Sequence, residues 1–172
     1  MKRLIRVLAV LLGLLLVAMA VLWFIGGRTY GNLAQVTISA PRATVFTYLT
    51  DPAKLKHWVD GVVAIEPLTS ERQTVGARSK IVVEEHGSRF EMNDEVIRYE
   101  PSEYLEVRIT SPMFGASNMY WLTDEQGKTH VKNVMRTDYQ GVARVFAPLM
   151  KGAVQQKLDA DLQRLKKLVE SQ

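Results

Sequence analysis

The chain has 172 residues with an ordinary apolar content of 47%, and it contains no cysteine. This length fits one domain with a short appendage, and the composition excludes wholesale disorder. The lack of cysteine excludes disulfides, thiolate metal sites and cysteine nucleophiles. The formal net charge is +4, but three of the positive charges lie within the first six residues. The rest of the chain is nearly neutral, so no nucleic-acid partner is expected.

The N-terminal region is typical of a membrane-spanning helix. Val7 to Ile25 is an uncharged run of 19 residues, which as a helix would extend about 28 Å, close to the hydrocarbon thickness of a bilayer. Residues 1–27 are therefore expected to form an N-terminal anchor that contacts the membrane through residues 4–25. Residues 28–172 are expected to form a separate domain.

The flanking residues predict how this helix is oriented and processed. Lys2, Arg3 and Arg6 precede the apolar run and predict a cytoplasmic N-terminus. The expected location is a single pass of the inner (cytoplasmic) membrane of a bacterium, with the domain facing the periplasm. A cleaved signal peptide is the alternative, because Ala18-Met19-Ala20 matches the small-x-small pattern that precedes a cleavage site.

The domain is predicted to begin with a strand and two short helices. Residues 33–39 are rich in β-branched side chains, which predicts a strand that ends at Ala40-Pro41. Helices are expected over residues 42–50 and 52–58. Asp51 is a favourable N-cap for the second helix, and Pro52 suits its first position.

Six further strands are predicted from alternating apolar residues and turn signals. Their short connections imply antiparallel neighbours. Phe114-Gly115-Ala116 follows Pro112 and is interpreted as a flexible break that could act as a lid. The expected strand ranges are 62–68, 77–85, 89–99, 104–110, 114–123 and 128–140.

From Gly141 the apolar period changes to 3.6, which predicts one long C-terminal helix. Pro148 is expected to kink it. One long helix can cover only one face of the sheet, so the sequence predicts an α+β fold in which a curved seven-stranded antiparallel sheet wraps around this helix. A straight helix fills a curved trough poorly, so the binding site is expected between helix and sheet. The apolar stripe comprises Val142, Val145, Phe146, Leu149, Met150, Val154, Leu158, Leu162, Leu165 and Val169.

Several short motifs make the sequence resemble the START-like superfamily, also called SRPBCC, which includes polyketide cyclases. The motifs are Val36 to Pro41 leading into Val45-Phe46, then Leu49-Thr50-Asp51-Pro52, and Trp58. Residues 33–170 also follow the β-α-α-β6-α order of this superfamily. The resemblance implies a helix-grip fold with an internal apolar cavity for lipids, steroids, polyketides or other hydrophobic molecules. The superfamily has no universal catalytic residues, so none is transferred to this chain.

Asp94 is the carboxylate of greatest interest. It alternates with Phe90, Met92 and Val96, so its side chain is expected to face inward, where a carboxylate needs a partner or a raised pKa. A structural ion pair, or a bulge that turns Asp94 outward, is favoured over a role in orienting a ligand or in catalysis. The candidate ion-pair partners are Arg98, Arg108 and Arg136.

The predicted cavity lining combines apolar side chains with a few inward polar groups. Methionine adapts to irregular apolar shapes, and inward Asn and Tyr could orient the polar group of a ligand. An ordinary core whose polar groups bond one another is an equally open interpretation. The predicted ligand-binding set is Trp58, Phe90, Met92, Asp94, Val107, Asn118, Tyr120, Met135, Tyr139, Phe146 and Met150.

Metal and cofactor sites are not expected. His57, His86 and His130 lack the spacing of a metal site, and no phosphate-binding or dinucleotide-binding fingerprint is present. His86 is placed in a solvated turn and His130 on an exposed strand face. His57 lies near the expected cavity mouth, although an ordinary surface position is the simpler interpretation.

Three functional hypotheses follow from the sequence. The first is a membrane-anchored protein that binds a hydrophobic ligand such as a lipid, a quinone or a polyketide-like molecule. The second is an enzyme of the cyclase or dehydratase type, with Asp94, Tyr139 or His57 as acid–base groups. The third is a non-catalytic subunit of a membrane complex, with a membrane-protein partner and no ligand.

Overall fold

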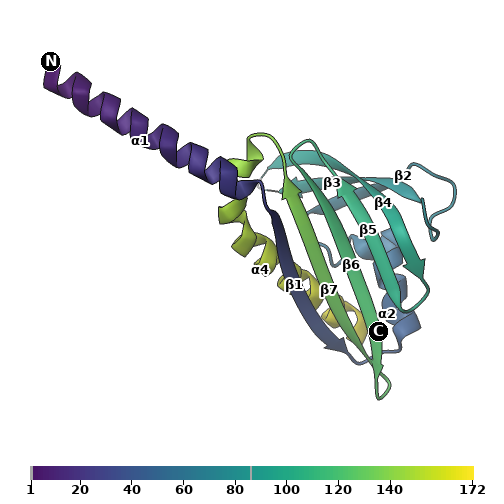
Figure 1. Ribbon diagram of the computed structural model, residues 1–172. Helices are drawn as coiled ribbons and strands as arrows, with labels where there is room; N and C mark the ends of the chain where they lie inside the picture. Colours follow the sequence, from purple (N-terminus) through teal and green to yellow (C-terminus); the bar gives the residue numbers. More distant parts are fainter. Residues whose placement is uncertain (1, 86) are drawn as a thin grey trace.

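The computed structural model describes residues 2–85 and 87–172, so the predicted turn position of His86 lies outside the described residues. It confirms the predicted α+β helix-grip fold, the order of its elements and the long apolar helix at the N-terminus (Figure 1). The elements are α1 (Lys2–Gly26), β1 (Thr29–Ile38), α2 (Arg42–Thr50), α3 (Pro52–Leu55), β2 (Val62–Pro67), β3 (Arg78–Glu85), β4 (Ser88–Glu100), β5 (Tyr104–Thr110), β6 (Phe114–Glu125), β7 (Lys128–Tyr139) and α4 (Ala143–Glu170).

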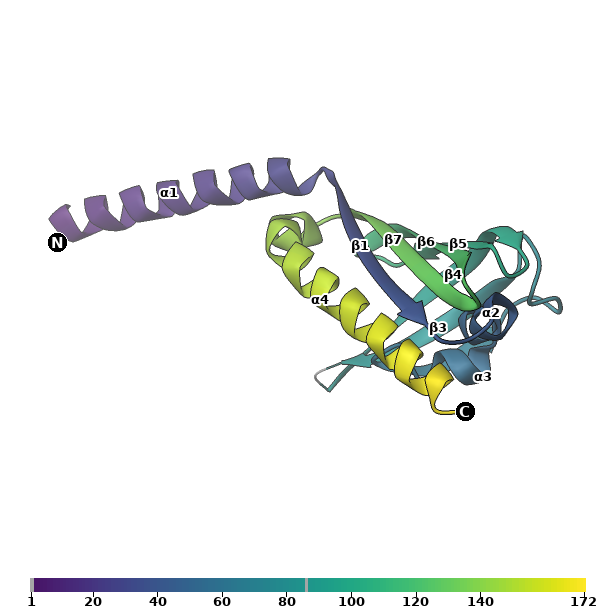
Figure 2. The same cartoon turned by 90° about the horizontal axis from the view of Figure 1, so that it is seen from below.

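The seven strands form one antiparallel sheet in the order β1-β7-β6-β5-β4-β3-β2. The sheet curves around α4, and α2 and α3 cover one end (Figures 1 and 2). β1 begins at Thr29 and not at residue 33 as predicted, since it pairs with β7 from Thr29–Asp138 to Ile38–Thr129. Gly31 and Asn32, which separate Thr29 and Tyr30 from the predicted strand, have low strand propensity, so this extension depends on the partner strand.

The predicted lid at Phe114-Gly115-Ala116 is wrong, because these residues form the first part of β6. Gly115 is paired with Thr110 of β5 and with Asp138 of β7, so its backbone is held on both sides. A segment inside a sheet with partners on both edges is among the more stable parts of a fold.

The two short helices form largely as predicted. The Asp51 side chain accepts a hydrogen bond of 2.9 Å from the backbone N–H of Ala53 and caps α3. α3 ends at Leu55, earlier than predicted, and turns then lead to Trp58. The indole Nε1–H of Trp58 donates to the carbonyl oxygen of Tyr48 at 2.9 Å, which holds this turn against α2.

The densest part of the core lies between the C-terminal half of α4, β1 and α2. Leu162 and Leu165 of α4 pack there with Ile38 of β1 and Val45 of α2, and all four side chains are fully buried. The apolar stripe of the sequence therefore covers the sheet along this half of the helix.

α1 projects away from the domain and is exposed along its length, with only Gly26 buried (Figures 1 and 2). Among the described residues it is the one helix long and apolar enough to cross a membrane, a property that signal sequences near an N-terminus share. The end of α1 packs on the first turn of α4. A Cβ atom on Gly26 would overlap the carbonyl oxygen of Arg144, so only glycine permits this approach.

Candidate functional site

A cavity of about 500 Å³ lies between α4 and the concave face of the sheet. Its walls come mainly from alternate residues of β3 to β7 and from α4, and most of them are apolar. Ten of the eleven residues predicted to bind a ligand line it: Trp58, Phe90, Met92, Asp94, Val107, Asn118, Tyr120, Met135, Tyr139 and Met150. Strand alternation brings them together because residues two apart share one face of a sheet. Their role in binding a ligand remains a prediction.

Phe146 is the exception, because it is not among the residues that line the cavity. Its side chain is 54% exposed. The smaller Ala143, together with Met150 and Val154, provides the wall on this part of α4. The apolar side chains on this part of α4 extend around more of the helix than the side that faces the cavity. Phe146 therefore faces outward.

β3 and the middle of α4 also contribute to the cavity wall, and none of their residues was in the predicted ligand-binding set. Ser79, Ile81 and Val83 of β3 line the cavity, and the same alternation that identified the β4 residues would have found them. Asp161 of α4 also lines the cavity. Its position next to Leu162 of the apolar stripe could have indicated that this acidic side chain lies near the interior.

Asp94 faces the cavity, as its alternation predicted, directly opposite Ser79 in the pairing of β3 with β4. Ser79 hydrogen-bonds the carboxylate, but the Oδ1 atom is buried without a partner among the described residues. Burial raises the pKa of Asp94 to about 6, although the hydrogen bonds from Ser79 oppose this shift. The cavity therefore holds an acceptor that no described protein group uses and that changes protonation near pH 6.

Both favoured interpretations of Asp94 are wrong, because it is not turned outward by a bulge and forms no ion pair with a described residue. Arg98 Nη2 lies 2.5 Å from Glu100 Oε1 on the same strand, and Arg108 Nη1 lies 3.7 Å from Glu95 Oε2. Glu95 alternates with Asp94 on β4 and therefore lies on the opposite face of the sheet. Glu100 follows the bulge after Val96. Within the described chain, these two arginines therefore contact other carboxylates. Arg136, the third candidate, is exposed and is not among the groups that affect Asp94.

Three polar side chains of the cavity wall, Asn118, Tyr120 and Asn133, are hydrogen-bonded to one another. Asn133 Nδ2 donates to Asn118 Oδ1 at 2.6 Å and to the carbonyl oxygen of Met119 at 3.1 Å. Asn118 Nδ2 in turn donates to the Tyr120 hydroxyl at 2.9 Å. Burial raises the pKa of Tyr120, so its hydroxyl stays protonated at neutral pH. These bonds use the tyrosine oxygen as an acceptor, and its proton takes no part in them.

Asp161 lies where α4 meets the turn after α3, and its contacts are structural. It accepts a hydrogen bond from the backbone N–H of Asp60 at 3.1 Å and pairs with Lys157 at 3.6 Å and with Arg164. Arg164 Nε also donates to the carbonyl oxygen of Trp58 at 3.0 Å. Burial raises the pKa of Asp161 against the opposing effect of the two cations. This cluster fixes α4 to the turn and closes one side of the cavity.

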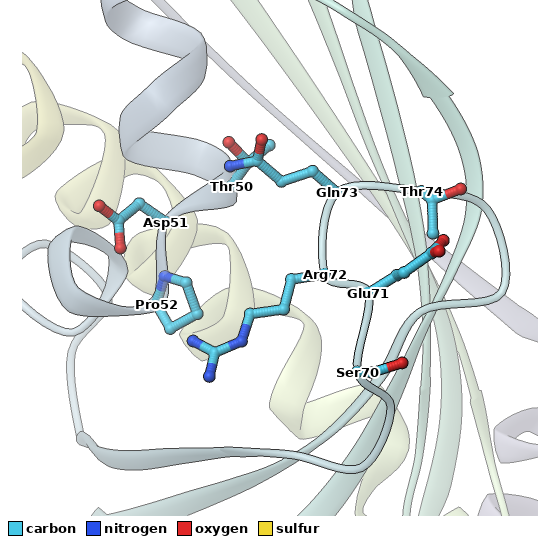
Figure 3. Close-up of a pocket in the computed structure, with 8 residues that line it drawn as sticks. All are labelled: Thr50, Asp51, Pro52, Ser70, Glu71, Arg72, Gln73 and Thr74. Carbon is cyan, nitrogen blue, oxygen red and sulfur yellow. The ribbon is translucent and has the colours of Figure 1, made fainter.

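A separate hollow of about 570 Å³ is open to solvent beside the junction of α2 and α3 (Figure 3). Its walls are polar and come from two segments, residues 50–52 and 70–74. The side chain of Arg72 reaches across it toward Pro52 (Figure 3). Thr50, Pro52 and Arg72 also line the apolar cavity, so the two spaces are neighbours. We take the apolar cavity as the candidate site, since it is the less open of the two and apolar walls favour a bound hydrophobic ligand.

The described histidines lie outside this site. His57 is exposed and does not line the cavity, so the predicted position near its mouth gives no contact with the interior. His130 is half-buried, and its ring contacts Thr37 at 3.2 Å and Gln35 at 3.1 Å on β1. Within residues 2–85 and 87–172, no cluster of three His, Asp or Glu side chains could hold a metal ion.

Several known structures share this fold. Ara h 8.0201 superposes with a TM-score of 0.69 at 16% identity, over 84% of this chain and 100% of that one. The di-domain ARO/CYC protein StfQ from the steffimycin biosynthetic pathway gives a TM-score of 0.69 at 9% identity, over 83% of this chain and 51% of that one. A protein from Thermus thermophilus, TTHA0849, gives a TM-score of 0.64 at 19% identity, over 82% of this chain and 97% of that one.

The sequence has no match among the curated proteins. Residues 34–170 match the family described as polyketide cyclase / dehydrase and lipid transport. This range runs from β1 to the end of α4, and it contains every residue that lines the cavity. The chain therefore belongs to the polyketide cyclase / dehydrase and lipid transport family, whose fold suggests that it binds a hydrophobic ligand.

Proposed function

We propose that this protein binds a hydrophobic small molecule or lipid in the cavity beneath α4, while residues 1–27 anchor it in a membrane. The observation that carries the proposal is the cavity of about 500 Å³ with mainly apolar walls. Ligand sites in proteins commonly have volumes of about 300 to 1,000 Å³. A membrane subunit with no ligand would gain nothing from leaving such a space unfilled, because unfilled core volume lowers stability.

The polar groups of the cavity indicate what kind of ligand fits. The Oδ1 atom of Asp94 offers a buried acceptor, and the Tyr120 hydroxyl proton is free of the asparagine bonds. A buried polar group without a partner costs free energy, and a ligand that bonds it recovers that cost. The ligand we propose is therefore an extended apolar molecule with one hydroxyl or amine that donates to Asp94. A lipid, a quinol or a polyketide-like molecule meets this description.

The anchor rests on α1 and its flanking charges. α1 carries Lys2, Arg3 and Arg6 at its start and no charged residue from Val7 to Gly26. This arrangement favours a cytoplasmic N-terminus in the inner membrane of a bacterium, with residues 28–172 on the periplasmic side. Intact mass measurement of the mature protein tests the anchor, since cleavage after Ala20 would give a chain that begins at Val21.

Ligand binding is tested on the full chain purified in a mild detergent. Native mass spectrometry and organic extraction should reveal a co-purifying apolar molecule with a hydroxyl or amine. In a matched pair of variants, Met135→Trp fills the cavity whereas Met119→Trp adds the same bulk elsewhere on the neighbouring strand. Met135→Trp should remove the ligand, and Met119→Trp should retain it. Equal ligand content in both variants, or none in the unmodified chain, would contradict the proposal.

An enzyme of the cyclase or dehydratase type is a second candidate, favoured by the state of Asp94. A carboxyl group with a pKa of about 6 in an apolar cavity is suited to accept and return a proton near neutral pH. Tyr139 also lines the cavity, and burial raises its pKa, so it would act as a hydrogen-bond donor. Once the ligand is identified, Asp94→Asn should abolish any turnover while ligand still binds. Unchanged turnover in this variant would exclude Asp94 as the acid–base group.

A further inference from the structure

The first turns of α4 expose an apolar surface that the domain does not cover. Val142, Phe146 and Leu149 are 71%, 54% and 73% exposed. Their spacing of four and three residues places them in one stripe along the helix. We call these three residues, together with Met113 and Met150, the collar.

The collar borders the cavity. Met113 and Met150 both line the cavity and are substantially exposed. Met113 lies beside the start of α4 because the backbone N–H of Gln140 donates to its carbonyl oxygen at 2.8 Å. The exposed apolar surface is therefore continuous with the apolar interior of the site.

The collar also lies at the end of the domain from which α1 projects. In both views α4 begins beside the end of α1, and its first turns lie on the side toward which α1 extends (Figures 1 and 2). The close approach of Gly26 to Arg144 fixes this arrangement, and the guanidinium of Arg144 lies 5.5 Å from the ring centroid of Trp23. Pro148 has no N–H to donate to the Arg144 carbonyl, which is the group that Gly26 packs against.

The charged residues along the N-terminal half of α4 are all basic, whereas Asp138 at the end of β7 accepts a hydrogen bond from Thr29. From Gln140 to Leu158 the charged residues are Arg144, Lys151 and Lys157, with no acidic residue among them. Arg28 follows α1 and is exposed. Basic side chains flanking an exposed apolar stripe are complementary to a bilayer with anionic headgroups.

We infer that the collar inserts into the bilayer interface beside α1, so that the cavity opens onto the lipid and not onto water. The inference rests on the proposed anchoring by α1, and it names a lipid surface as the partner of the first turns of α4. A hydrophobic ligand would then pass between bilayer and cavity without crossing the aqueous phase. Insertion into the bilayer interface would also remove the apolar side chains of the collar from water.

The lack of cysteine in the chain allows a direct test with single-cysteine variants. Leu149→Cys reports on the collar, Leu12→Cys on α1, and Leu68→Cys on an exposed leucine just after the edge strand β2, where the side chain is 56% exposed. Each full-length variant is labelled with an environment-sensitive fluorophore and reconstituted in nanodiscs of phosphatidylcholine and phosphatidylglycerol. Brominated acyl chains then quench only the labels that contact lipid.

The expected result is strong quenching at position 12, loss of about half of the emission at position 149 and no quenching at position 68, since an interfacial helix buries its apolar face only at the headgroup–acyl boundary. Quenching at position 12 but not at 149 would overturn this inference and leave the anchor intact. An unquenched label at position 12 would overturn the anchor itself. A label at 149 that is shielded from water yet unquenched would mean that another protein covers the collar, and it would also overturn the inference.

Discussion

The two halves of α4 carry one continuous apolar stripe in the sequence, but the stripe is buried in the C-terminal half and largely exposed in the N-terminal half. In the C-terminal half, Leu162 and Leu165 are fully buried against β1 and α2. In the N-terminal half, Phe146 and Leu149 are mostly exposed, and their neighbours line the cavity. The periodicity of a helix indicates which residues share a face, but not what covers that face. The covered half stabilises the fold, and we assign the uncovered half to ligand and membrane.

The largest contrast is expected from the same substitution in each half. Leu165→Ala should lower the free energy of unfolding by about 2 to 5 kcal/mol, since it leaves a cavity in a fully packed region. Leu149→Ala should change it by less than about 0.5 kcal/mol in detergent, where its side chain contacts little protein. Urea unfolding of the full chain in mild detergent, followed by circular dichroism, measures both values. Equal losses would contradict the division of α4 into two functional halves.

Asp94, on the cavity wall, should make the free energy of unfolding depend on pH. Because the pKa of Asp94 is raised to about 6 from 3.8, the folded state binds more protons than the unfolded state between these two values. Stability from this group is therefore greatest below about pH 4 and is lost as the pH rises to about 6.

Asp94→Asn should remove this decline. The variant should match the unmodified chain near pH 4 and exceed it by roughly 2 kcal/mol at pH 7, a value discounted for the part of Asp94 that remains solvated. Unfolding measured at both pH values tests the sign, and a variant that is less stable at pH 7 would contradict it. Asp161, whose pKa burial also raises, remains in both proteins and accounts for any residual slope of the same sign.

A smaller effect is expected at the boundary between packed core and cavity. Tyr120→Phe removes the hydroxyl that accepts from Asn118 and should cost about 1 kcal/mol of stability. If the tyrosine proton bonds the ligand, the affinity for the co-purified molecule should fall by about tenfold as well. Calorimetric titration measures the affinity, and unaltered binding would assign the Asn118–Tyr120–Asn133 group to the core alone.

The smallest effect on stability but a clear effect on geometry is expected at the end of α1. Gly26→Ala places a methyl group against the Arg144 carbonyl and should separate α1 from α4, whereas Gly13→Ala meets no atom within 4 Å. Both variants should unfold within about 0.5 kcal/mol of the unmodified chain. Lipid quenching of a label at position 149 should fall in the Gly26→Ala variant only. Equal quenching in both would show that this contact does not set the orientation of the domain.

The sequence allowed the element order, the sheet and most of the cavity wall to be predicted, because alternation in strands and a 3.6-residue period in helices are local properties. It could not predict the early start of β1, where Gly31 and Asn32 become a strand only through pairing with β7. Nor could it show that Asp94 lacks a cationic partner among the described residues, because Arg98 and Arg108 contact other carboxylates in three dimensions. Phe146 was wrongly predicted to line the cavity for a related reason. Its place in the apolar stripe of α4 does not indicate how much of that stripe the cavity contacts.

The connection between α1 and β1 is only Gly27 and Arg28, and both are hydrogen-bonded back to α1 at 3.3 and 3.2 Å. Two residues span at most about 7 Å, so the domain cannot move far from the end of α1. With α1 anchored in a membrane, as we propose, the domain could not carry a ligand to a second membrane. The ligand would then reach the cavity by lateral diffusion in the adjacent leaflet, and its transfer through water would require a different carrier.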